Sequence, residues 1–240
     1  MKVLVLGHKG MLGNMVYKYL STKEDCELIT TDLRWPSEDF KNFAVNFDGD
    51  FIVNCIGAIH QKKTNFSINT DLPIWLDMIK GNFVIIHPST DCEMGSEYGD
   101  SKRNASDYIK ENGLKTIIIK TSVIGSELNS KNSLLEWFLN SKDEVFGYSD
   151  VYWNGNTTLQ WAKISYDMMK NNSKHQNEYI FSSSCISKYK LLNLIKEVYE
   201  KDINILKCSK IKINNCLVGG TITPSIKKQL KEMREFYYDN

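Results

Sequence analysis

Short hydrophobic segments alternate with amphipathic ones over the first two-thirds of the chain. The hydrophobic segments are rich in Val, Ile and Phe, and each ends at polar or glycine-bearing residues: Lys2–Leu6, Glu27–Thr31, Phe51–Cys55, Phe83–His87 and Thr116–Thr121. Strands that are apolar on both faces belong in a parallel sheet covered by helices on both sides. The intervening segments predict helices at Met11–Leu20, Phe66–Lys80 and Glu97–Asn112. This alternation predicts an α/β fold with a doubly wound parallel sheet.

After about residue 125 the alternation is less regular. Helices are predicted at Asn129–Ser141, Thr158–Asn171 and Ser187–Lys201 and from Pro224, and strands at Glu178–Phe181 and Ile203–Cys208. Phe146–Asn156 is aromatic and contains glycine, and we interpret it as a loop between two helices. We therefore expect a core at 1–125 and a smaller lobe at 126–240 that packs on the core and can return elements to the sheet.

Composition narrows the class of protein. The chain has 240 residues, of which 42% are hydrophobic and 25% charged, which are values of an ordinary globular protein. Its net charge of +1 argues against a nucleic acid partner, and it has no apolar run long enough to span a membrane. Its six cysteines form neither a C-x-x-C pair nor a cluster with histidines. We expect a cytoplasmic protein with reduced thiols and no metal site.

A glycine-rich loop follows the first predicted strand directly. The sequence G-H-K-G-M-L-G places glycines at 7, 10 and 13, and the next strand leads to Asp32. In a Rossmann fold such glycines allow a tight turn, a close approach of pyrophosphate and close packing of helix on strand, while the acidic residue binds the adenosine ribose. A structural turn without a ligand remains the alternative. Asp32 favours NAD, whereas Lys9 and Arg34 could bind the 2′-phosphate of NADP or be solvated surface charges, so the choice between NAD and NADP stays open.

A second pattern, Tyr98-Gly-Asp-Ser-Lys102, follows the strand that ends at Ser89 and Thr90. Residues i and i+4 share one face of a helix, and an ammonium beside a phenol lowers the pKa of the phenol. Such a tyrosine can donate a proton to a carbonyl oxygen that a hydroxyl of Thr90 or Ser89 also holds. The alternative for Tyr98 is a half-buried aromatic residue beside a surface lysine.

In this order the motifs resemble the extended short-chain dehydrogenase/reductase family, and more narrowly its dTDP-4-dehydrorhamnose reductase branch. The matching segments are the first thirteen residues, V-N-C-I-G at 53–57, I-N-T at 68–70, S-T-D at 89–91, Y-G-D-S-K at 98–102 and I-I-I-K-T-S-V-I-G at 117–125. The resemblance implies catalytic roles for Thr90, Tyr98 and Lys102. It also implies cofactor contacts from Gly7, Gly10, Met11, Leu12, Gly13, Asp32, Cys55, Ile56, Gly57, Asn69 and Lys102, to which we add Lys9, Arg34, Ser89 and Tyr98.

The chain departs from the family pattern at several places: it is short for the family, the stretch after V-I-G lacks the family's tryptophan or tyrosine, and two further departures concern the substrate site. Only seven residues separate Thr90 from Tyr98, where the family has a longer loop, so the substrate site is expected to be more open or to be completed by another subunit of a homodimer. The second half has N-G-N-T-T-L at 154–159 in place of the family's G-x-P-T-Y. Substrate contacts are predicted from Tyr152, Trp153 and Asn154, with Tyr148 nearby; the alternative is that these aromatic residues belong to the core of the lobe.

The resemblance implies an NAD(P)H-dependent reductase of a keto nucleotide sugar in glycan or polysaccharide precursor synthesis. Two alternatives stay open. One is an epimerase that holds NAD tightly and oxidises and re-reduces its sugar. The other is a non-catalytic subunit that binds a dinucleotide and regulates a partner, which the short Thr90–Tyr98 segment favours and the complete Tyr-Lys-Thr set opposes.

Overall fold

The chain folds into two compact units. The computed structural model describes residues 1–59, 65–92, 95–128, 131–171 and 177–239. The first unit contains Met1–Lys120 and Ala162–Tyr179, and the second contains Thr121–Trp161 and Ile180–Asn240. Residues 162–179 thus belong to the first unit although the chain reaches them only after passing through part of the second.

A parallel sheet forms the centre of the first unit. Its strands are β1 (Lys2–Leu6), β2 (Glu27–Thr30), β3 (Phe51–Asn54), β4 (Val84–Ser89) and β5 (Thr116–Lys120). They run parallel in the order β2-β1-β3-β4-β5, and β9 (Glu178–Ser182) and β12 (Thr221–Ile222) extend the sheet to seven strands. Because β2 and β3 flank β1 on opposite sides, the strand order reverses at β1. The predicted doubly wound parallel sheet is confirmed.

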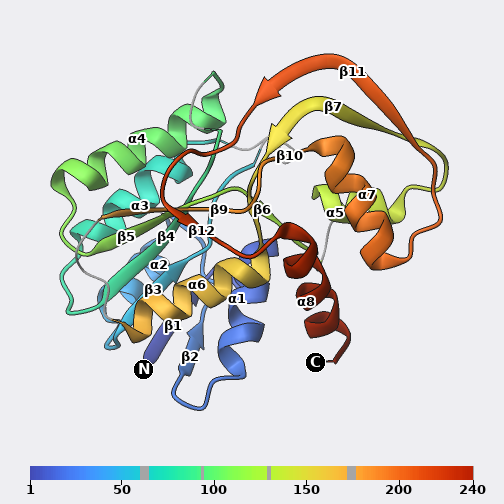
Figure 1. Cartoon of the computed structure of the whole chain (residues 1–240). Coiled ribbons are helices and arrows are strands. Elements are labelled where there is room, and N and C mark those ends of the chain that lie inside the picture. Colours follow the sequence, from blue (N-terminus) through green and yellow to red (C-terminus); the bar gives the residue numbers. More distant parts are fainter. Residues whose placement is uncertain (60–64, 93–94, 129–130, 172–176, 240) are drawn as a thin grey trace. The chain divides into compact units, whose positions relative to one another are not determined.

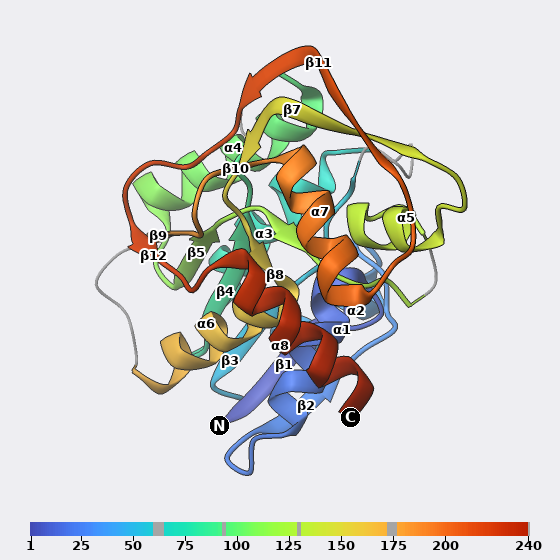
Figure 2. The same cartoon turned by 45° about the vertical axis from the view of Figure 1, so that its right-hand side comes forward.

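Helices cover both faces of this sheet (Figures 1 and 2). They are α1 (Met11–Ser21), α2 (Glu38–Val45), α3 (Ile68–Met78), α4 (Glu97–Asn112) and the part of α6 (Thr158–Lys170) that lies in the first unit. The α3 and α4 helices pack together on one face. On the other face α1 lies beside α6, where the rings of Tyr19 and Tyr166 are 6.2 Å apart.

The short helix α2 was not predicted from the sequence. Ser37 caps it by accepting a hydrogen bond from the Phe40 backbone N–H at 3.2 Å. Phe40 is fully buried and packs in the same cluster as Leu6, Leu72 and Ile85, so α2 is stabilised by the core that it covers. A helix of two turns depends on such tertiary packing, which explains why its sequence pattern alone did not reveal it.

The second unit contains a three-stranded sheet in the order β10-β7-β11. Its strands are β10 (Ile186–Ser187), β7 (Val145–Trp153) and β11 (Ile205–Asn214), and the unit also contains β6 (Val123–Ile124), β8 (Asn156–Thr157), α5 (Leu134–Asn140), α7 (Lys188–Tyr199) and α8 (Ile226–Asp239). The helix α7 packs on β7, where an added Cβ at Gly147 would lie 2.8 Å from the Tyr189 ring. Gly147 thus permits the close packing of helix on strand.

The interpretation of Phe146–Asn156 as a loop is wrong, because most of it is β7. Along β7 Phe146 and Tyr148 are exposed while Val145 and Gly147 are buried, which is the two-residue alternation of a strand with one covered face. The glycine and the aromatic residues obscured this alternation in the sequence. The helix predicted at Asn129–Ser141 is α5, which begins at Leu134; positions 129 and 130 lie outside the described residues.

The expectation of reduced thiols is wrong for two of the six cysteines. Cys185 and Cys216 form a disulfide with their Cα atoms 5.9 Å apart, within the range that a disulfide requires. The other four cysteines form no disulfide. The two bonded residues are 31 positions apart and meet only because β10 and β11 flank β7, so their spacing in the sequence did not reveal the pair.

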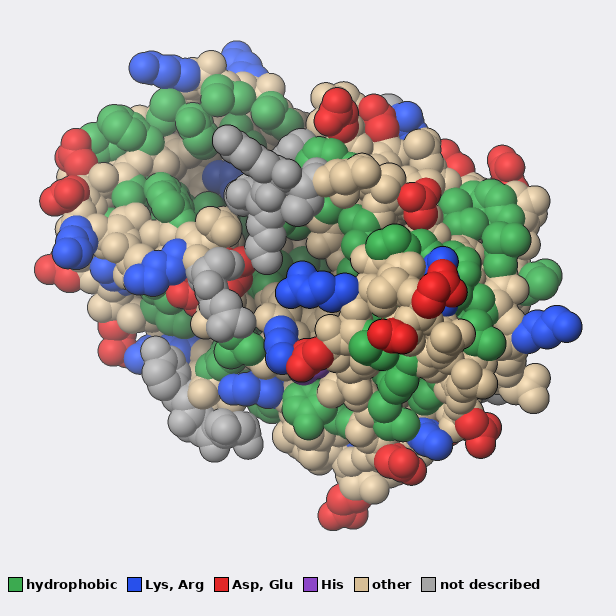
Figure 3. Space-filling model, turned by 180° about the vertical axis from the view of Figure 1, so that it is seen from behind, with side chains coloured by type: hydrophobic (Ala, Val, Ile, Leu, Met, Phe, Trp, Pro, Cys, Tyr) green, Lys and Arg blue, Asp and Glu red, His purple; other side chains and the backbone are tan. Residues whose placement is uncertain are grey.

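The surface carries charges of both signs. On the face in Figure 3 Lys and Arg side chains are interspersed with Asp and Glu, without one large field of a single sign. Among the described residues no helix is both long and apolar enough to cross a membrane.

Asp77 joins α3 to the start of β5, and its removal is expected to destabilise the first unit. Its buried carboxylate accepts hydrogen bonds from the Thr116 hydroxyl at 2.6 Å and from the backbone N–H groups of Leu114 and Lys115. Asp77→Ala leaves these donors without a partner, so we expect a loss of about 2–3 kcal/mol in the free energy of unfolding, measured by urea denaturation. Asp107→Ala, which removes an exposed ion pair on α4, should change it by less than about 0.5 kcal/mol. Equal effects of the two substitutions would contradict this role.

Candidate active site

The glycine loop lies where β1, α1 and the end of β3 come into close contact. Gly7 has a φ of +77°, and a Cβ added to it would lie 3.0 Å from the Cys55 backbone. A Cβ on Gly13 would lie 2.2 Å from the Gly7 carbonyl oxygen, so no side chain fits there. Gly10 differs, because it is exposed and its added Cβ would meet only the Gly7 oxygen, at 3.3 Å. Gly7 and Gly13 are thus needed for folding, while Gly10 leaves the loop open on its outer side.

The N-terminus of α1 fits the phosphates of a dinucleotide. No side chain caps this end of the helix, so its first N–H groups, at Met11 and Leu12, are available to an anion. Two buried atoms beside it, His8 Nδ1 and Asn14 Oδ1, have no hydrogen-bond partner among the described residues. Buried polar atoms are normally satisfied, so these atoms indicate room for a polar ligand.

Asp32 follows β2 and lies beside the glycine loop. Its two carboxylate oxygens are 2.6 and 2.7 Å from Lys9 Nζ, and one of them is 3.8 Å from His8 Nε2. The hydrogen bond from Lys9 lowers the pKa of Asp32, with smaller contributions from His8 and Arg34. Both side chains of the pair are exposed, and an exposed ion pair exchanges readily for other partners. Sugar hydroxyls could therefore bind the Asp32 carboxylate in place of Lys9, and a phosphate could bind the Lys9 ammonium.

The loop after β3 faces the glycine loop of residues 7–13, and we call the space between these two loops the glycine cradle. Asn69 holds the loop after β3 in place. Asn69 Oδ1 accepts from the Ala58 N–H at 2.8 Å, and its Nδ2 donates to Ala58 O at 3.2 Å and to Ser101 Oγ at 3.1 Å. Gly57 is enclosed, since an added Cβ would lie 3.0 Å from Asn69 Oδ1 and 3.5 Å from Lys102 Nζ. Asn69 is buried and its amide is used within the protein, so in this structure it positions the loop.

A cavity of about 430 Å³ opens beside this loop. Trp35 and Pro36, shortly after Asp32, line one part of it, and Gly57 and Ala58 line another. Trp35 was not singled out in the sequence, although an aromatic residue shortly after an acidic strand end is a signal that could have found it. An apolar wall of this kind can hold the ring of a nucleotide base.

A larger cavity of about 540 Å³ lies at the amino ends of β4 and β5. Phe83 and Val84 at the start of β4, and Lys115 and Thr116 at the start of β5, line it. Ligands of open α/β sheets bind at the carboxyl ends of the strands, and the cluster of candidate catalytic residues also lies at that end. The smaller cavity therefore fits the candidate site better despite its size.

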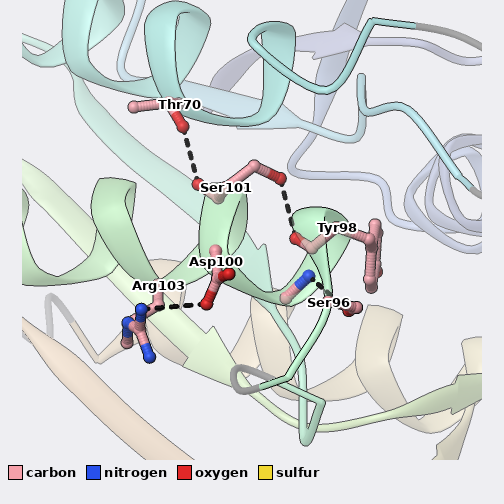
Figure 4. A network of polar contacts seen from close by, with 7 residues as sticks. Thr70, Ser96, Tyr98, Asp100, Ser101 and Arg103 are labelled. Carbon is pink, nitrogen blue, oxygen red and sulfur yellow. Dashed lines mark hydrogen bonds and ion pairs between the residues drawn. The ribbon is translucent and has the colours of Figure 1, made fainter.

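The first turns of α4 are fixed by a series of hydrogen bonds (Figure 4). Ser96 caps the helix by accepting from the Gly99 N–H at 3.1 Å. Ser101 Oγ donates to Tyr98 O at 2.7 Å, while Thr70 Oγ1 donates to Ser101 O at 2.8 Å and so ties α4 to α3. An Asp100–Arg103 ion pair of 2.9 Å lies on the same turns. The backbone that carries Tyr98 and Lys102 is thus held rigidly against the neighbouring helix.

Tyr98 lies next to Thr90, the first residue after β4. Burial raises the pKa of Tyr98, a hydrogen bond with Thr90 lowers it, and nearby Cys92 and Asp91 raise it. The net direction is upward, so the expectation that Lys102 lowers the pKa of this phenol is wrong for the chain as it stands. The phenol is therefore protonated at neutral pH.

Lys102 is 7% exposed and has a backbone oxygen as its hydrogen-bond partner. Its Nζ donates to Pro88 O at 3.2 Å, and burial lowers the pKa of Lys102 to about 8. Around it burial raises the pKa of the Cys55 thiol to about 12 and holds the pKa of His87 well below its usual value. His87 Nδ1 lies 3.2 Å from Asn54 Nδ2, so His87 is a neutral packing residue.

Two other expected residues have partners of their own. Ser89 Oγ lies 3.1 Å from Ser106 Oγ on α4 and is buried there. Ile56 donates its backbone N–H to Asn54 Oδ1 at 3.1 Å, which shapes the loop. The first unit therefore brings together Thr90, Tyr98 and Lys102 with the glycine cradle's second wall, while Ser89 lies under α4.

The residues predicted to bind substrate lie on or just after β7 in the second unit. Tyr152 is 40% exposed, whereas Trp153 is 3% exposed and has Lys188 Nζ 4.7 Å from its ring centre. Asn154 donates from Nδ2 to Leu217 O at 2.8 Å and accepts at Oδ1 from the Leu217 N–H at 2.9 Å. Tyr152, with Tyr148 on the same strand, thus offers exposed aromatic surface, while Trp153 and Asn154 are engaged within the unit. Their role in substrate binding stays a prediction.

The N-G-N-T-T-L segment is also engaged within the second unit. Asn156 Nδ2 donates to Thr121 Oγ1 at 2.8 Å, and Gln229 of α8 donates to Asn156 Oδ1 at 3.0 Å. The Thr157 N–H donates to Gln229 Oε1 at 2.9 Å. This buried network anchors the last helix.

In the described part of the chain no three His, Cys, Asp or Glu side chains are grouped as a metal site requires.

Comparison with known proteins shows what the fold resembles. No protein-family model and no curated protein matches the sequence. A solved dTDP-4-dehydrorhamnose reductase from Clostridium acetobutylicum is 20% identical, with a TM-score of 0.83 over 99% of this chain and 100% of that chain. The same enzyme from Bacillus anthracis, in complex with NADP, is 14% identical, with a TM-score of 0.73 over 100% and 99%.

A third similar structure is the ADP-L-glycero-D-manno-heptose-6-epimerase of Helicobacter pylori, 11% identical with a TM-score of 0.78 over 100% of this chain and 96% of that chain. All three identities are low, so the likeness establishes the fold. The Rossmann-type fold expected from the glycine loop is thereby confirmed, and the likeness to these structures covers essentially the whole chain, the second unit included.

Replacing Lys102 by methionine is expected to stabilise the fold. Because the folded protein holds the pKa of Lys102 near 8 and the unfolded chain has it near 10.5, the unfolded state binds more protons between these values. Burial of the charge therefore destabilises the folded protein at pH 7, and the penalty shrinks as the pH rises from 8 to 10.5. After the loss of the Pro88 hydrogen bond, Lys102→Met should raise the free energy of unfolding by about 1–3 kcal/mol at pH 7 and by less at pH 9.5.

Urea denaturation at both pH values measures this effect. Lys41→Met is the control, because Lys41 lies on the surface helix α2 in an ion pair with the exposed Glu38. The control should change stability little at either pH. A Lys102→Met protein that is less stable than the wild type at pH 7 would show that burial of the Lys102 charge does not destabilise the fold.

Proposed function

We propose that the chain is an NAD(P)H-dependent reductase of a keto nucleotide sugar that serves glycan or polysaccharide precursor synthesis. The observation that carries this proposal is the grouping of Tyr98, Thr90 and Lys102 at the carboxyl edge of the parallel sheet. Lys102 Nζ comes within 3.5 Å of the Cβ position of Gly57, on the second wall of the glycine cradle. A proton donor thus lies beside a site suited to a dinucleotide.

The named activities of the similar structures support the substrate class. Two of those described above are dTDP-4-dehydrorhamnose reductases, and another similar structure, from Campylobacter jejuni, is a GDP-mannoheptose C4 reductase with NADP bound. The epimerase among them keeps the alternative of an NAD-dependent epimerase within the same fold. The Tyr98 phenol can supply the proton that a carbonyl oxygen needs when its carbon receives hydride, a step that a reductase and an epimerase share.

The cofactor would bind along the carboxyl ends of β1, β2 and β3. Gly7, Gly10 and Gly13 with the N–H groups of Met11 and Leu12 would hold the pyrophosphate, and Asp32 with Lys9 and Arg34 would meet the ribose. Cys55, Ile56 and Gly57 would line the opposite side, which Asn69 positions. When bound, a nicotinamide dinucleotide supplies the hydride.

The residues of α4 and β4 supply the proton. Thr90 holds the Tyr98 phenol by a hydrogen bond, and the same hydroxyl can orient a substrate carbonyl oxygen. Tyr98 donates its proton to that oxygen, which becomes the hydroxyl of the product. Lys102, four residues further along α4, can bind the ribose of the cofactor.

The proposal also includes a surface for the substrate, a homodimer and a cytoplasmic location. Tyr152 and Tyr148 offer the exposed aromatic surface on which a nucleobase or sugar ring could stack. A second copy of the chain, in a homodimer, could complete a site that the short Thr90–Tyr98 segment leaves open. We also propose a cytoplasmic location.

Tyr98→Phe tests the catalytic assignment. The substitution keeps the ring, which packs edge-on against Phe66, so folding should persist. Turnover should fall by roughly 10²–10⁴, the usual contribution of general acid catalysis. The measurement follows NADPH and NADH oxidation with a panel of 4-keto nucleotide sugars. Tyr108→Phe, on the same helix, is the control and should retain wild-type kcat.

Three outcomes separate the readings. A Tyr98→Phe enzyme with unchanged kcat would end the proposed mechanism. Conversion of a nucleotide sugar to its epimer without net cofactor oxidation would indicate the epimerase. Cofactor binding without turnover of any sugar in the wild type would favour the regulatory subunit.

Gly10→Val tests the cofactor cradle separately. Gly10 has φ −84° and ψ 168°, which valine adopts readily, so the fold should be retained. The added side chain would occupy the open outer side of the loop where the pyrophosphate must approach. We expect affinity for NADPH and NADH to fall at least about 100-fold, equivalent to about 2.7 kcal/mol, by calorimetry. Unchanged affinity in a folded variant would place the dinucleotide elsewhere.

A further inference from the structure

The end of β7 is held between two flanking segments of the second unit. On one side β10 pairs with it antiparallel, with Ile186 opposite Trp153 and Ser187 opposite Tyr152. On the other side β11 pairs with it parallel, with Asn214 opposite Tyr152. Figures 1 and 2 both show β7 between β10 and β11. Tyr152 is thus the point at which both flanking strands meet β7.

Residues just outside β10 and β11 add further hydrogen bonds to the end of β7. The Ser183 N–H donates to Asn154 O at 2.7 Å from the β10 side, and the Asn215 N–H donates to Tyr152 O at 3.1 Å from the β11 side. The Asn154 side chain bonds both backbone groups of Leu217. Each flanking segment therefore contributes its own contacts to residues 152–154.

The disulfide joins the two flanking segments covalently. Cys185 directly precedes β10 and lies two residues after Ser183. Cys216 lies between Asn215 and Leu217, which both bind the end of β7. The bond therefore adds a covalent link between two segments that otherwise hold residues 152–154 by hydrogen bonds and by packing around the buried Trp153 ring.

This disulfide is accessible to a reductant. Cys185 is exposed and Cys216 is half-buried, and Val218 beyond it is almost fully exposed. Exposed disulfides exchange readily with thiols, whereas buried structural ones resist reduction. The free Cys208, on β11 of the same sheet, is half-buried and unbonded, so it offers an internal comparison.

We propose that Cys185–Cys216 is a reversible thiol–disulfide site that controls the order of residues 152–154. In the oxidised chain both flanks are fixed and Tyr152 is held in one position. In the reduced chain hydrogen bonds and packing must hold the flanks without the covalent link, and the segment opens more often. Where this concerns substrate affinity, the inference rests on the proposed function; where it concerns the order of the segment, it does not.

The exchange balances with a dithiol as reductant. One thiolate of the dithiol attacks one sulfur of the Cys185–Cys216 bond and releases the other cysteine as a thiolate, which takes up a proton. The second thiolate of the reductant then attacks the mixed disulfide and releases the first cysteine. The protein gains two electrons and two protons, and the two thiols of the reductant become a disulfide.

Hydrogen exchange with peptide mass spectrometry tests the effect on the segment. With dithiothreitol we expect amide exchange in peptides that cover 150–156 and 214–218 to accelerate at least tenfold, while peptides from β1 and α1 stay unchanged. Cys185→Ser and Cys216→Ser should show the fast exchange without reductant and no further response to it. Cys208→Ser should behave as the wild type. Equal protection of 150–156 before and after reduction would overturn the proposal.

Alkylation establishes the redox state in the same samples. Iodoacetamide under denaturing conditions should modify four cysteines in the air-oxidised chain, since four lie outside the disulfide, and all six after reduction. Modification of all six without reductant would show that the bond does not form, which also overturns the proposal.

Kinetic measurements distinguish a failure of the thiol–disulfide proposal from a failure of the proposed function. In the reduced wild type and both disulfide variants the KM for the keto nucleotide sugar should rise at least about fivefold, while the Kd for NADPH stays constant. If no nucleotide sugar is turned over, the proposed function fails while the exchange experiment still decides the thiol–disulfide site. If turnover occurs and KM is the same in both redox states, control of the substrate segment is refuted.

Discussion

The close approach of three backbone segments at the end of β1 is the constraint on which the candidate site depends. The Gly13 Cα packs against the Gly7 carbonyl oxygen, and Gly7 packs against the Cys55 backbone, at separations that leave no room for a side chain. This contact sets the start of α1 and the distance between the loops after β1 and β3. Both walls of the cradle follow from it, because the strand order reverses at this point of the sheet.

The catalytic candidates depend on a different kind of contact. Asn69 and Thr70 on α3 bind Ser101 on α4, and this polar attachment orients the helix that carries Tyr98 and Lys102. Lys102 is consequently buried beside a backbone carbonyl, an environment that disfavours its charge. A buried lysine of this kind weakens the fold, and such a residue is more readily explained by chemistry than by packing. The same burial keeps the Tyr98 phenol protonated, as a proton donor requires.

The second unit uses polar contacts and a disulfide where the first uses a large parallel sheet. Asn156 and Gln229 form a buried network that anchors α8, and the Cys185–Cys216 bond brackets the end of β7. Trp153 and Asn154 are part of this internal support, while Tyr152 between the two flanking strands stays exposed. The segment therefore combines a fixed backbone with an accessible aromatic ring, which suits recognition of a planar ligand.

The parallel sheet, the glycine loop and the helix of Tyr98 and Lys102 could be predicted from the amino-acid sequence. Five apolar strands, three spaced glycines and a helix with an i, i+4 pair are local signals, and α4 begins and ends at the predicted residues. The short helix α2 and the strand β7 were missed because a two-turn helix and a glycine-bearing aromatic strand depend on the core that covers them.

The pKa shifts at the site and the pairing of the cysteines depend on how the chain packs. The pKa of Tyr98 rises because burial outweighs the hydrogen bond with Thr90, and burial lowers the pKa of Lys102. Burial is a property of the packed molecule, so spacing along a helix predicted which residues lie together but not the sign of the shift. Likewise Cys185 and Cys216 meet because two strands flank a third, and a distance set by strand pairing cannot be read from a separation of 31 residues.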